Sequence, residues 1–220
     1  MKLRMLSLSI LVLGFASCTT FSSHPYPAYI VDPSPALLKR GMVAVVKPGF
    51  LPVLSGGLLN YIAANNSDQD HAVEIEASES ILKSNISSLN EAGIDTVPVD
   101  QTLTQDQLML IIKAGYSKQK NAIKAIGELA KAIALQNKAQ YVLIEFLQCY
   151  IGEPLVIASH RIHGEAMVIS ADGEIVGFGY INTGWADFEL IDPEKYKLLL
   201  VEAEMDSAKL MTAFYAPPLK

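Results

Sequence analysis

The chain has 220 residues, of which 50% are hydrophobic and 18% charged, and its formal net charge at pH 7 is −6. This length and apolar content suit one domain with a sizeable core. An acidic chain without basic runs binds nucleic acid poorly, so we expect no nucleic-acid partner.

The first 17 residues have the layout of a cleaved export signal. A short cationic start precedes an apolar stretch over residues 6–13, which is too short to span a membrane. The motif at residues 15–18, Phe-Ala-Ser-Cys, resembles the lipobox of bacterial lipoprotein signals, which ends in the cysteine that is lipidated. The alternative is an ordinary signal cleaved near Ala16, which leaves Cys18 as a stray cysteine.

The lipobox resemblance implies that the mature chain begins at Cys18 and is anchored to a membrane by acyl chains. Two or more chains give stable anchoring, with each buried CH₂ contributing about 0.8 kcal/mol. Thr19 follows the cysteine, where an aspartate would indicate inner-membrane retention. We therefore expect an outer-membrane anchor facing the periplasm. Loss of Lys2 and Arg4 with the signal changes the formal charge from −6 to −8.

The chain has only two cysteines, Cys18 and Cys149. Lipidation of Cys18 leaves Cys149 without a cysteine partner, so we expect no disulfide in the chain. Because Cys149 lies in a strongly apolar run, its simplest role is that of a small core residue.

Residues 18–40 are rich in proline and serine, and we interpret them as a tether between the lipid and the folded part. Residues 41–220 are predicted to form a single domain. Its first element is a buried strand at Met42–Val46, which Pro48-Gly49 ends.

The next segment, Phe50–Asn66, is apolar and surrounds Gly56-Gly57, a good hairpin turn. It is predicted to be a small hairpin or an apolar loop. Its side chains need a cover, which the domain's own core, a partner protein or subunit, or the membrane can supply. Each arm is too short to cross a bilayer, so packing on self or on a partner is favoured. The candidate partner-binding residues are Phe50, Leu51, Leu54, Leu58, Leu59 and Tyr61.

Two predicted elements follow this segment. Ser67–Ala92 has apolar residues at helical spacing, and Gly93 is its stop signal. Ile94–Val99 is a short strand, in which Pro98 indicates the strand's end or a sheet edge.

Two further helices are predicted before the next strand. A capping box at Thr104 and Gln107 opens a short helix that Gly115 closes. Ser117 is expected to cap a longer helix, with Asn137 as its left-handed terminator.

A second apolar strand is predicted at Tyr141–Tyr150, with Glu145 as its outlier. One interpretation is a buried carboxyl group with a raised pKa, because desolvation disfavours the charged form. The favoured interpretation is a strand end or sheet edge, where Glu145 is exposed to solvent.

Val156–Ser170 and Glu174–Trp185 are predicted to form a hairpin around Asp172-Gly173. One face of the first arm packs, and the other is expected to be partly wet. That second face carries Arg161, His163, Glu165 and Met167.

A final helix is predicted to start at Asp192-Pro193, which combines a cap with a proline at the first helical position. Its buried face is expected to carry Leu198, Leu199, Val201, Met205, Ala208 and Met211.

These elements predict an α/β fold in which a mixed sheet has helices on its faces and ends in an antiparallel hairpin and a C-terminal helix. The order resembles the amino-terminal domain fold of TolB, which curli-secretion channel subunits, penicillin-binding-protein activators of the LpoB type and DUF799-type lipoproteins share. The carrying segments are Met42–Val46, Asn85–Val99 and Glu128–Ile144. The resemblance implies the fold more firmly than any function.

Signatures of catalysis are mostly absent from the sequence. It has no nucleophile elbow, phosphate loop, zinc-binding H-E-x-x-H or paired C-x-x-C motif. His160 and His163, three residues apart on a strand, point to opposite faces and cannot share one metal ion. We therefore expect no metal, no cofactor and no catalytic residue.

The sequence leaves two hypotheses for the function. The first is a non-catalytic interaction or scaffold lipoprotein of an envelope assembly, such as secretion or cell-wall machinery, with an envelope protein or a second copy as partner. The second is a small-ligand-binding or enzymatic lipoprotein with a pocket near His163, Glu165 and Asp187. The anchor, the tether and the apolar segment favour the first.

Overall fold

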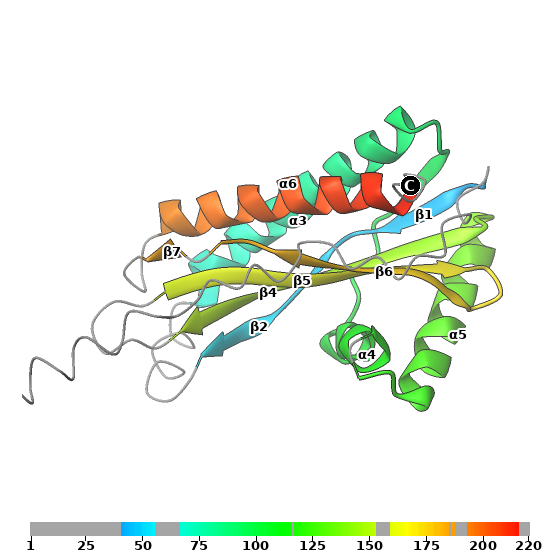
Figure 1. The fold of residues 1–220 in the computed structure, drawn as a ribbon, viewed down its shortest axis with the longest axis horizontal. Helices are drawn as coiled ribbons and strands as arrows, with labels where there is room; N and C mark the ends of the chain where they lie inside the picture. The colour runs from blue at the N-terminus through cyan, green and yellow to red at the C-terminus, as the bar shows by residue number, and fades with distance from the viewer. Residues whose placement is uncertain are drawn as a thin grey trace, which may run out of the picture.

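The computed structural model describes residues 41–55, 67–115, 117–152, 159–184, 186–187 and 193–215, which form a sheet between two helical layers (Figure 1). The strands are β1 (Val43–Val46), β2 (Gly49–Ser55), β3 (Thr96–Val99), β4 (Tyr141–Gly152), β5 (Ser159–Ser170), β6 (Ile175–Asn182) and β7 (Ala186–Asp187). The helices are α3 (Ser67–Glu91), α4 (Gln105–Gly115), α5 (Lys120–Asn137) and α6 (Pro193–Tyr215).

The main path of the sheet runs β3-β1-β4-β5-β6, with β2 also beside β4 and β7 beside β5. β1 is parallel to β3 and β4, because helices make the crossover connections that parallel strands need. β4, β5 and β6 are antiparallel. The predicted α/β class, with a mixed sheet, a terminal hairpin and a C-terminal helix, is confirmed.

β2 is a strand where the sequence suggested one arm of a hairpin or a loop. β1 pairs with the beginning of β4, and β2 pairs with its continuation from Phe146 onward, also in parallel. Pro48 ends β1 as predicted, since it has no N–H to donate to the ladder. The chain nevertheless continues in the same direction along β4. The predicted turn at Gly56-Gly57 lies outside the described residues.

Both faces of the central strand β4 are buried. Figure 1 shows α3 and α6 on one face of the sheet and α4 and α5 on the other. Leu143 and Leu147 belong to the core under α3 and α6, whereas Ile144 and Phe146 belong to the core under α4 and α5. A strand covered on both sides has a continuous apolar sequence instead of an alternating one, as this strand does.

The second face of β5 is drier than the sequence suggested. Met167 is fully buried and Glu165 is only 2% exposed. The prediction of a partly wet face is therefore wrong for this part of β5, because α4 and α5 both contact the strand. His163 keeps partial exposure further along the same face.

The capping box that opens α4 is present. The backbone N–H of Gln107 donates to Thr104 Oγ1 at 3.3 Å, and the N–H of Thr104 donates to Gln107 Oε1 at 2.9 Å. This reciprocal pair satisfies two helix-terminal donors that α4 itself cannot bond.

The predicted ends of α5 are wrong by two residues at the start and one at the end. The helix begins at Lys120 with Gln119 as its N-cap, so Ser117 is not the cap. The left-handed residue at the other end is Lys138, with φ of 53°, and not Asn137. The Asn137 side chain instead donates a hydrogen bond from Nδ2 to the carbonyl oxygen of Ile133.

Gly127 in α5 allows a close approach to the β5–β6 turn and generates a stability prediction. A Cβ atom on Gly127 would lie 2.5 Å from the carbonyl oxygen of Gly173. Gly127→Ala should gain about 1 kcal/mol from helix propensity, but we expect a net loss of about 1–2 kcal/mol because backbone must move. Urea denaturation measures the change, with the exposed neighbour Glu128→Ala as control. A stabilised Gly127→Ala variant would contradict this packing.

Candidate functional site

The outward face of α6 carries three exposed apolar side chains. Leu198, Val201 and Met205 are 69%, 53% and 56% exposed. Their spacings of three and four residues place them on one face of the helix, and we call them the α6 stripe. None of the helices in the described part of the chain is long and apolar enough to cross a membrane.

The prediction that the α6 stripe packs into the core is wrong. Leu199 and Met211 are buried as predicted, and the rest of the buried face of α6 is formed by Tyr196, Leu200, Ala203, Asp206, Ser207, Leu210 and Phe214. Apolar residues occur on more than one face of this helix, so periodicity alone does not select the buried face.

Polar contacts with α3 set the rotation of α6. The hydroxyl of Tyr196 donates to Glu74 Oε1 at 2.9 Å, and the hydroxyl of Ser80 donates to Glu204 Oε2 at 2.7 Å. These two links, two turns of helix apart, hold α6 alongside α3. The α6 stripe is therefore turned away from the sheet and toward solvent.

A second candidate surface lies on the α4–α5 face of the sheet, where its apolar side chains give way to polar and aromatic ones. The strand register places Tyr150 opposite Arg161, His163 opposite Asn182, and Glu165 opposite Tyr180. Because side chains alternate between faces, all of them share one face. We call these residues the sheet-face cluster: Tyr150, Arg161, His163, Glu165, Tyr180 and Asn182.

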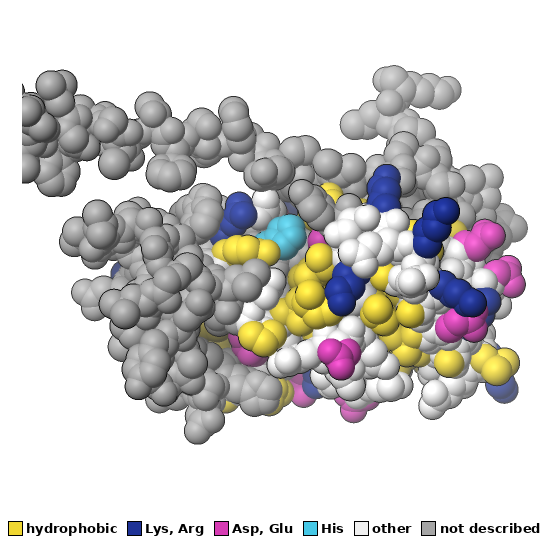
Figure 2. Space-filling view, turned by 90° about the horizontal axis from the view of Figure 1, so that it is seen from below, with side chains coloured by type: hydrophobic (Ala, Val, Ile, Leu, Met, Phe, Trp, Pro, Cys, Tyr) yellow, Lys and Arg dark blue, Asp and Glu magenta, His cyan; other side chains and the backbone are white. Residues whose placement is uncertain are grey.

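Aromatic contacts connect the sheet-face cluster. The ring of His163 lies 5.8 Å from the ring of Tyr150, edge to face, and 5.9 Å from the ring of Tyr180. The Arg161 guanidinium lies 5.5 Å from the centre of the Tyr150 ring, within the range of a cation–π interaction. Figure 2 shows this side of the molecule, with a histidine exposed beside hydrophobic side chains.

The charges of the sheet-face cluster are partly buried. His163 Nε2 lies 3.9 Å from Glu165 Oε1, a contact that becomes an ion pair when the imidazole is protonated. Burial raises the pKa of Tyr150 above its ordinary value, although Arg161 opposes the rise. Tyr150 therefore stays a neutral phenol at neutral pH. Neutral rings beside a guanidinium suit the binding of another molecule.

The predicted ligand residues come together only in part. Asp187 in β7 pairs with Ser159 and lies four residues along the sheet from His163, which is about 13 Å at 3.3 Å per residue. His160 is 4% exposed and lies on the opposite face of β5 from His163. The described residues contain no group of three or more His, Cys, Asp or Glu that could hold a metal ion.

Most of the predicted partner-binding residues pack on the domain or lie outside the described residues. Leu51 is 3% exposed, and Phe50 packs against the core under α3 and α6. The domain itself covers Leu51, so a partner-binding role for this residue is not compatible with its burial. The structure describes only the backbone of Leu54, within β2. Leu58, Leu59, Tyr61 and Cys18 lie outside the described residues.

Glu145 is the polar group whose position the sequence prediction missed. It is 1% exposed on the central strand β4, so the favoured interpretation of an exposed strand end is wrong. Asn85 of α3 donates to its Oε2 from Nδ2 at 2.8 Å, and Ser207 of α6 lies 2.9 Å from the same oxygen. Two polar residues at core-facing positions of the helices were the available signal.

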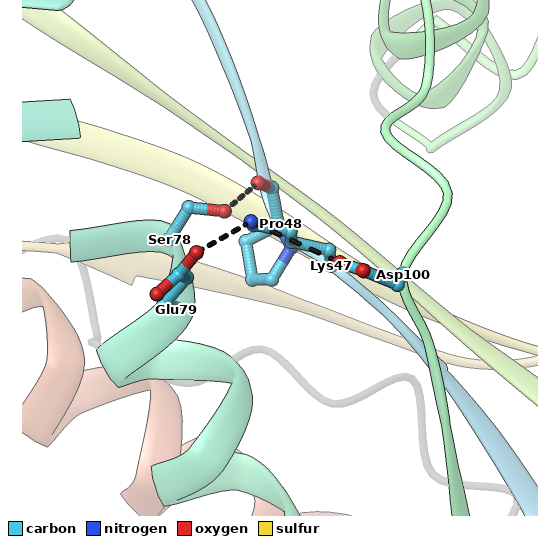
Figure 3. A network of polar contacts seen from close by, with 5 residues as sticks. All are labelled: Lys47, Pro48, Ser78, Glu79 and Asp100. Carbon is cyan, nitrogen blue, oxygen red and sulfur yellow. Dashed lines mark hydrogen bonds and ion pairs between the residues drawn. The ribbon is translucent and has the colours of Figure 1, made fainter. Parts of the chain in front are cut away.

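A further polar network lies where β1 ends (Figure 3). Lys47 Nζ lies 3.2 Å from Glu79 Oε1 and 3.9 Å from Asp100 Oδ1, and the hydroxyl of Ser78 donates to the carbonyl oxygen of Pro48. In open α/β sheets, ligands bind beyond the carboxyl ends of parallel strands. Here that end of β1 is occupied by this network and by β2.

Comparisons with known proteins give fold-level neighbours only. No family model and no curated protein matches the chain in sequence. The PelC dodecamer of Paraburkholderia phytofirmans has a TM-score of 0.42 at 15% identity, covering 86% of this chain and 96% of that one. Lipoprotein GNA1162 of Neisseria meningitidis has a TM-score of 0.37 at 13% identity, covering 76% and 97%. Likeness this distant says nothing of function.

The network around Lys47 predicts unequal costs for two substitutions. Ser78→Ala leaves the Pro48 carbonyl oxygen without this buried donor and should lower the free energy of unfolding by about 1–2 kcal/mol. Lys47→Met removes ion pairs to exposed carboxylates and should cost less than about 1 kcal/mol. Denaturation of both variants in the same buffer measures the order. A larger loss for Lys47→Met would mean that the ion pairs dominate this junction.

Proposed function

We propose that the chain is a lipid-anchored periplasmic lipoprotein whose domain, residues 41–220, is a non-catalytic interaction module of an envelope assembly. The observation that carries this proposal is the α6 stripe. Three large apolar side chains on one helix, each more than half exposed, are the kind of surface that marks a protein contact. An apolar groove on a partner accepts such a helix face at these spacings.

The size of the α6 stripe suits a weak contact that the anchor strengthens. Burying one fully exposed large apolar side chain contributes about 1.5–3 kcal/mol, so the three side chains contribute at most about 4.5–9 kcal/mol. Association itself costs about 4–15 kcal/mol in lost freedom. The stripe alone therefore gives little net affinity in free solution. Confining both partners to one membrane raises their effective concentration and lowers this cost.

The amino-terminal sequence supports the same function. The lipobox-like motif ending at Cys18 supplies the anchor, and the Pro-rich residues 19–40 supply the tether. An extended polyproline segment spans about 3.1 Å per residue, which gives the tether a reach of up to about 70 Å. The outer membrane, facing the periplasm, is the location that Thr19 favours.

A second function, the binding of a small ligand, rests on the sheet-face cluster. Three rings and a guanidinium on one face are groups that orient a flat or polar ligand. A ligand-induced rise in melting temperature that His163→Ala abolishes would favour this function. An equal rise in melting temperature in His163→Ala would contradict this function.

The interaction function predicts that the α6 stripe is needed for complex formation but not for folding. The double variant Leu198→Ser and Val201→Ser should keep its free energy of unfolding to within about 1 kcal/mol, because both side chains are exposed. It should lose a partner, or a second copy, that cross-linking in envelopes and co-purification of the lipidated chain recover with wild type.

The matched control for the α6 stripe is Leu135→Ser, since Leu135 on α5 is 84% exposed and lies in the other helical layer. This variant should retain the complex. Equal recovery from the double variant and wild type would show that the stripe is not the docking surface, whichever protein is recovered.

The anchor predicts a separate result for Cys18→Ala. Wild type should fractionate with outer membranes and carry the mass of its acyl chains, because two or more chains give stable anchoring. Cys18→Ala should lack that mass. Mass spectrometry of the amino-terminal peptide decides between the two. An unmodified cysteine on the wild-type chain would leave only the ordinary export signal as the interpretation.

A further inference from the structure

Three buried polar side chains from three elements meet between the sheet and the α3–α6 layer. Glu145 of β4, Asn85 of α3 and Ser207 of α6 are each at most 1% exposed. Asn85 Nδ2 and Glu145 Oε2 are 2.8 Å apart, Ser207 Oγ and Asn85 Oδ1 are 2.8 Å apart, and Ser207 Oγ and Glu145 Oε2 are 2.9 Å apart. The three contacts form a closed ring.

The ring needs a proton on Glu145. A serine hydroxyl has one hydrogen to donate, and Ser207 contacts two oxygen acceptors. If Ser207 donates to Asn85 and Asn85 donates to Glu145, the third contact requires a hydrogen on Glu145 Oε2. Exchanging the oxygen and nitrogen of the Asn85 amide reverses the direction of the ring and still requires that hydrogen. All three contacts are hydrogen bonds only when Glu145 is a neutral acid.

Ionisation of Glu145 breaks this arrangement. Ser207 and Asn85 then both donate to Glu145 Oε2, and the 2.8 Å contact between Ser207 Oγ and Asn85 Oδ1 becomes a repulsion between two acceptors. Glu145 Oε1 is buried and has no hydrogen-bond partner among the described residues. A neutral carbonyl oxygen tolerates that position at modest cost, whereas a carboxylate oxygen does not.

The charged groups near the ring are paired or distant. On α6, Asp206 adjoins Ser207 but pairs with Lys209 at 2.9 Å. Glu204 is partly buried and accepts a hydrogen bond from Ser80 of α3. On the sheet, Glu145 lies opposite Ala166 of β5.

Three other titratable groups of the described strands share this face of the sheet: Tyr141 and Cys149 on β4, each four residues from Glu145, and His160 on β5, further toward the far end of the strands. Burial is therefore the main influence on the pKa of Glu145.

We propose that Glu145, Asn85 and Ser207 form a proton-operated latch, which fastens α3 and α6 to β4 while Glu145 is protonated and frees this helical layer when Glu145 ionises. The latch joins one residue from each of the three elements. When Glu145 loses its proton, the contacts that tie Asn85 of α3 and Ser207 of α6 to Glu145 are weakened. The apolar contacts of the layer remain and limit the release to a minor, pH-dependent population.

The sign of the pH dependence follows from the pKa. Burial raises the pKa of Glu145 from 4.5 to about 7, against the opposing hydrogen bonds from Ser207 and Asn85. The latched state therefore holds the proton more tightly than the open state. Latching is strongest below about pH 4.5 and is lost as the pH rises through about 7. Between these values the open population should rise about tenfold per pH unit, and above them it should level off.

Hydrogen exchange of the full chain between pH 5 and 8 tests the latch, with each amide corrected for its intrinsic exchange rate. Amides of α3 and α6 should lose protection about tenfold per pH unit up to about pH 7 and should open more readily than amides of β4 and β5. In Glu145→Gln, which stays neutral at every pH, this slope should vanish. Glu204→Gln alters a carboxylate on the same helix pair but outside the ring, and should keep the slope.

Three results would overturn the proposal: no slope in wild type, the same slope in Glu145→Gln, or α3 and α6 amides no more labile than those of β4 and β5. Labelling of Cys149 gives a second readout, because this thiol is 4% exposed in the core under α3 and α6. The experiment uses a Cys18→Ser background, and the labelling rate of Cys149 is divided by its labelling rate in the unfolded chain at the same pH. This ratio should rise with pH. It should not rise with pH when Glu145→Gln is added.

Discussion

The pairing of β4 is the constraint on which the rest of the structure depends. This strand of 12 residues takes β1 and then β2 along one side and the whole of β5 along the other. Because β4 is apolar on both faces, each face needs a helical cover, and α3–α6 and α4–α5 supply one each. Every surface with a candidate role lies on an element that packs against β4 or pairs with its neighbour β5.

Local signals in the sequence predicted the elements well. The capping box of α4, the apolar run of β4 and the Asp172-Gly173 turn each depend on residues close together in the chain. The parallel pairing of β2 with β4 joins segments almost a hundred residues apart, and Gly56-Gly57 suggested a more local hairpin. The start of α5 was missed because Gln119, its N-cap, makes no side-chain capping bond.

The candidate sites were harder to predict, because each depends on which face of an element is covered. Leu198 and Leu199 are neighbours of the same residue type, yet one is 69% exposed and the other 3%. Glu145 looked like an edge residue because its partners, Asn85 and Ser207, are about 60 residues away on either side. Only the packing of α3 and α6 brings these groups together. His163 and Glu165 were predictable as a pair, since alternation along β5 places them on one face.

Pro98 has a consequence for how this molecule meets others of its kind. Asp95 and Val99 accept hydrogen bonds from the backbone N–H groups of Val43 and Lys47, so by alternation Pro98 directs its backbone away from β1, at the side of β3 where no described strand pairs. A strand from another chain that aligned there would find no N–H at this position. Four residues interrupted by one proline make a poor template for edge-to-edge aggregation. Contacts that other molecules make along this edge are therefore left to side chains.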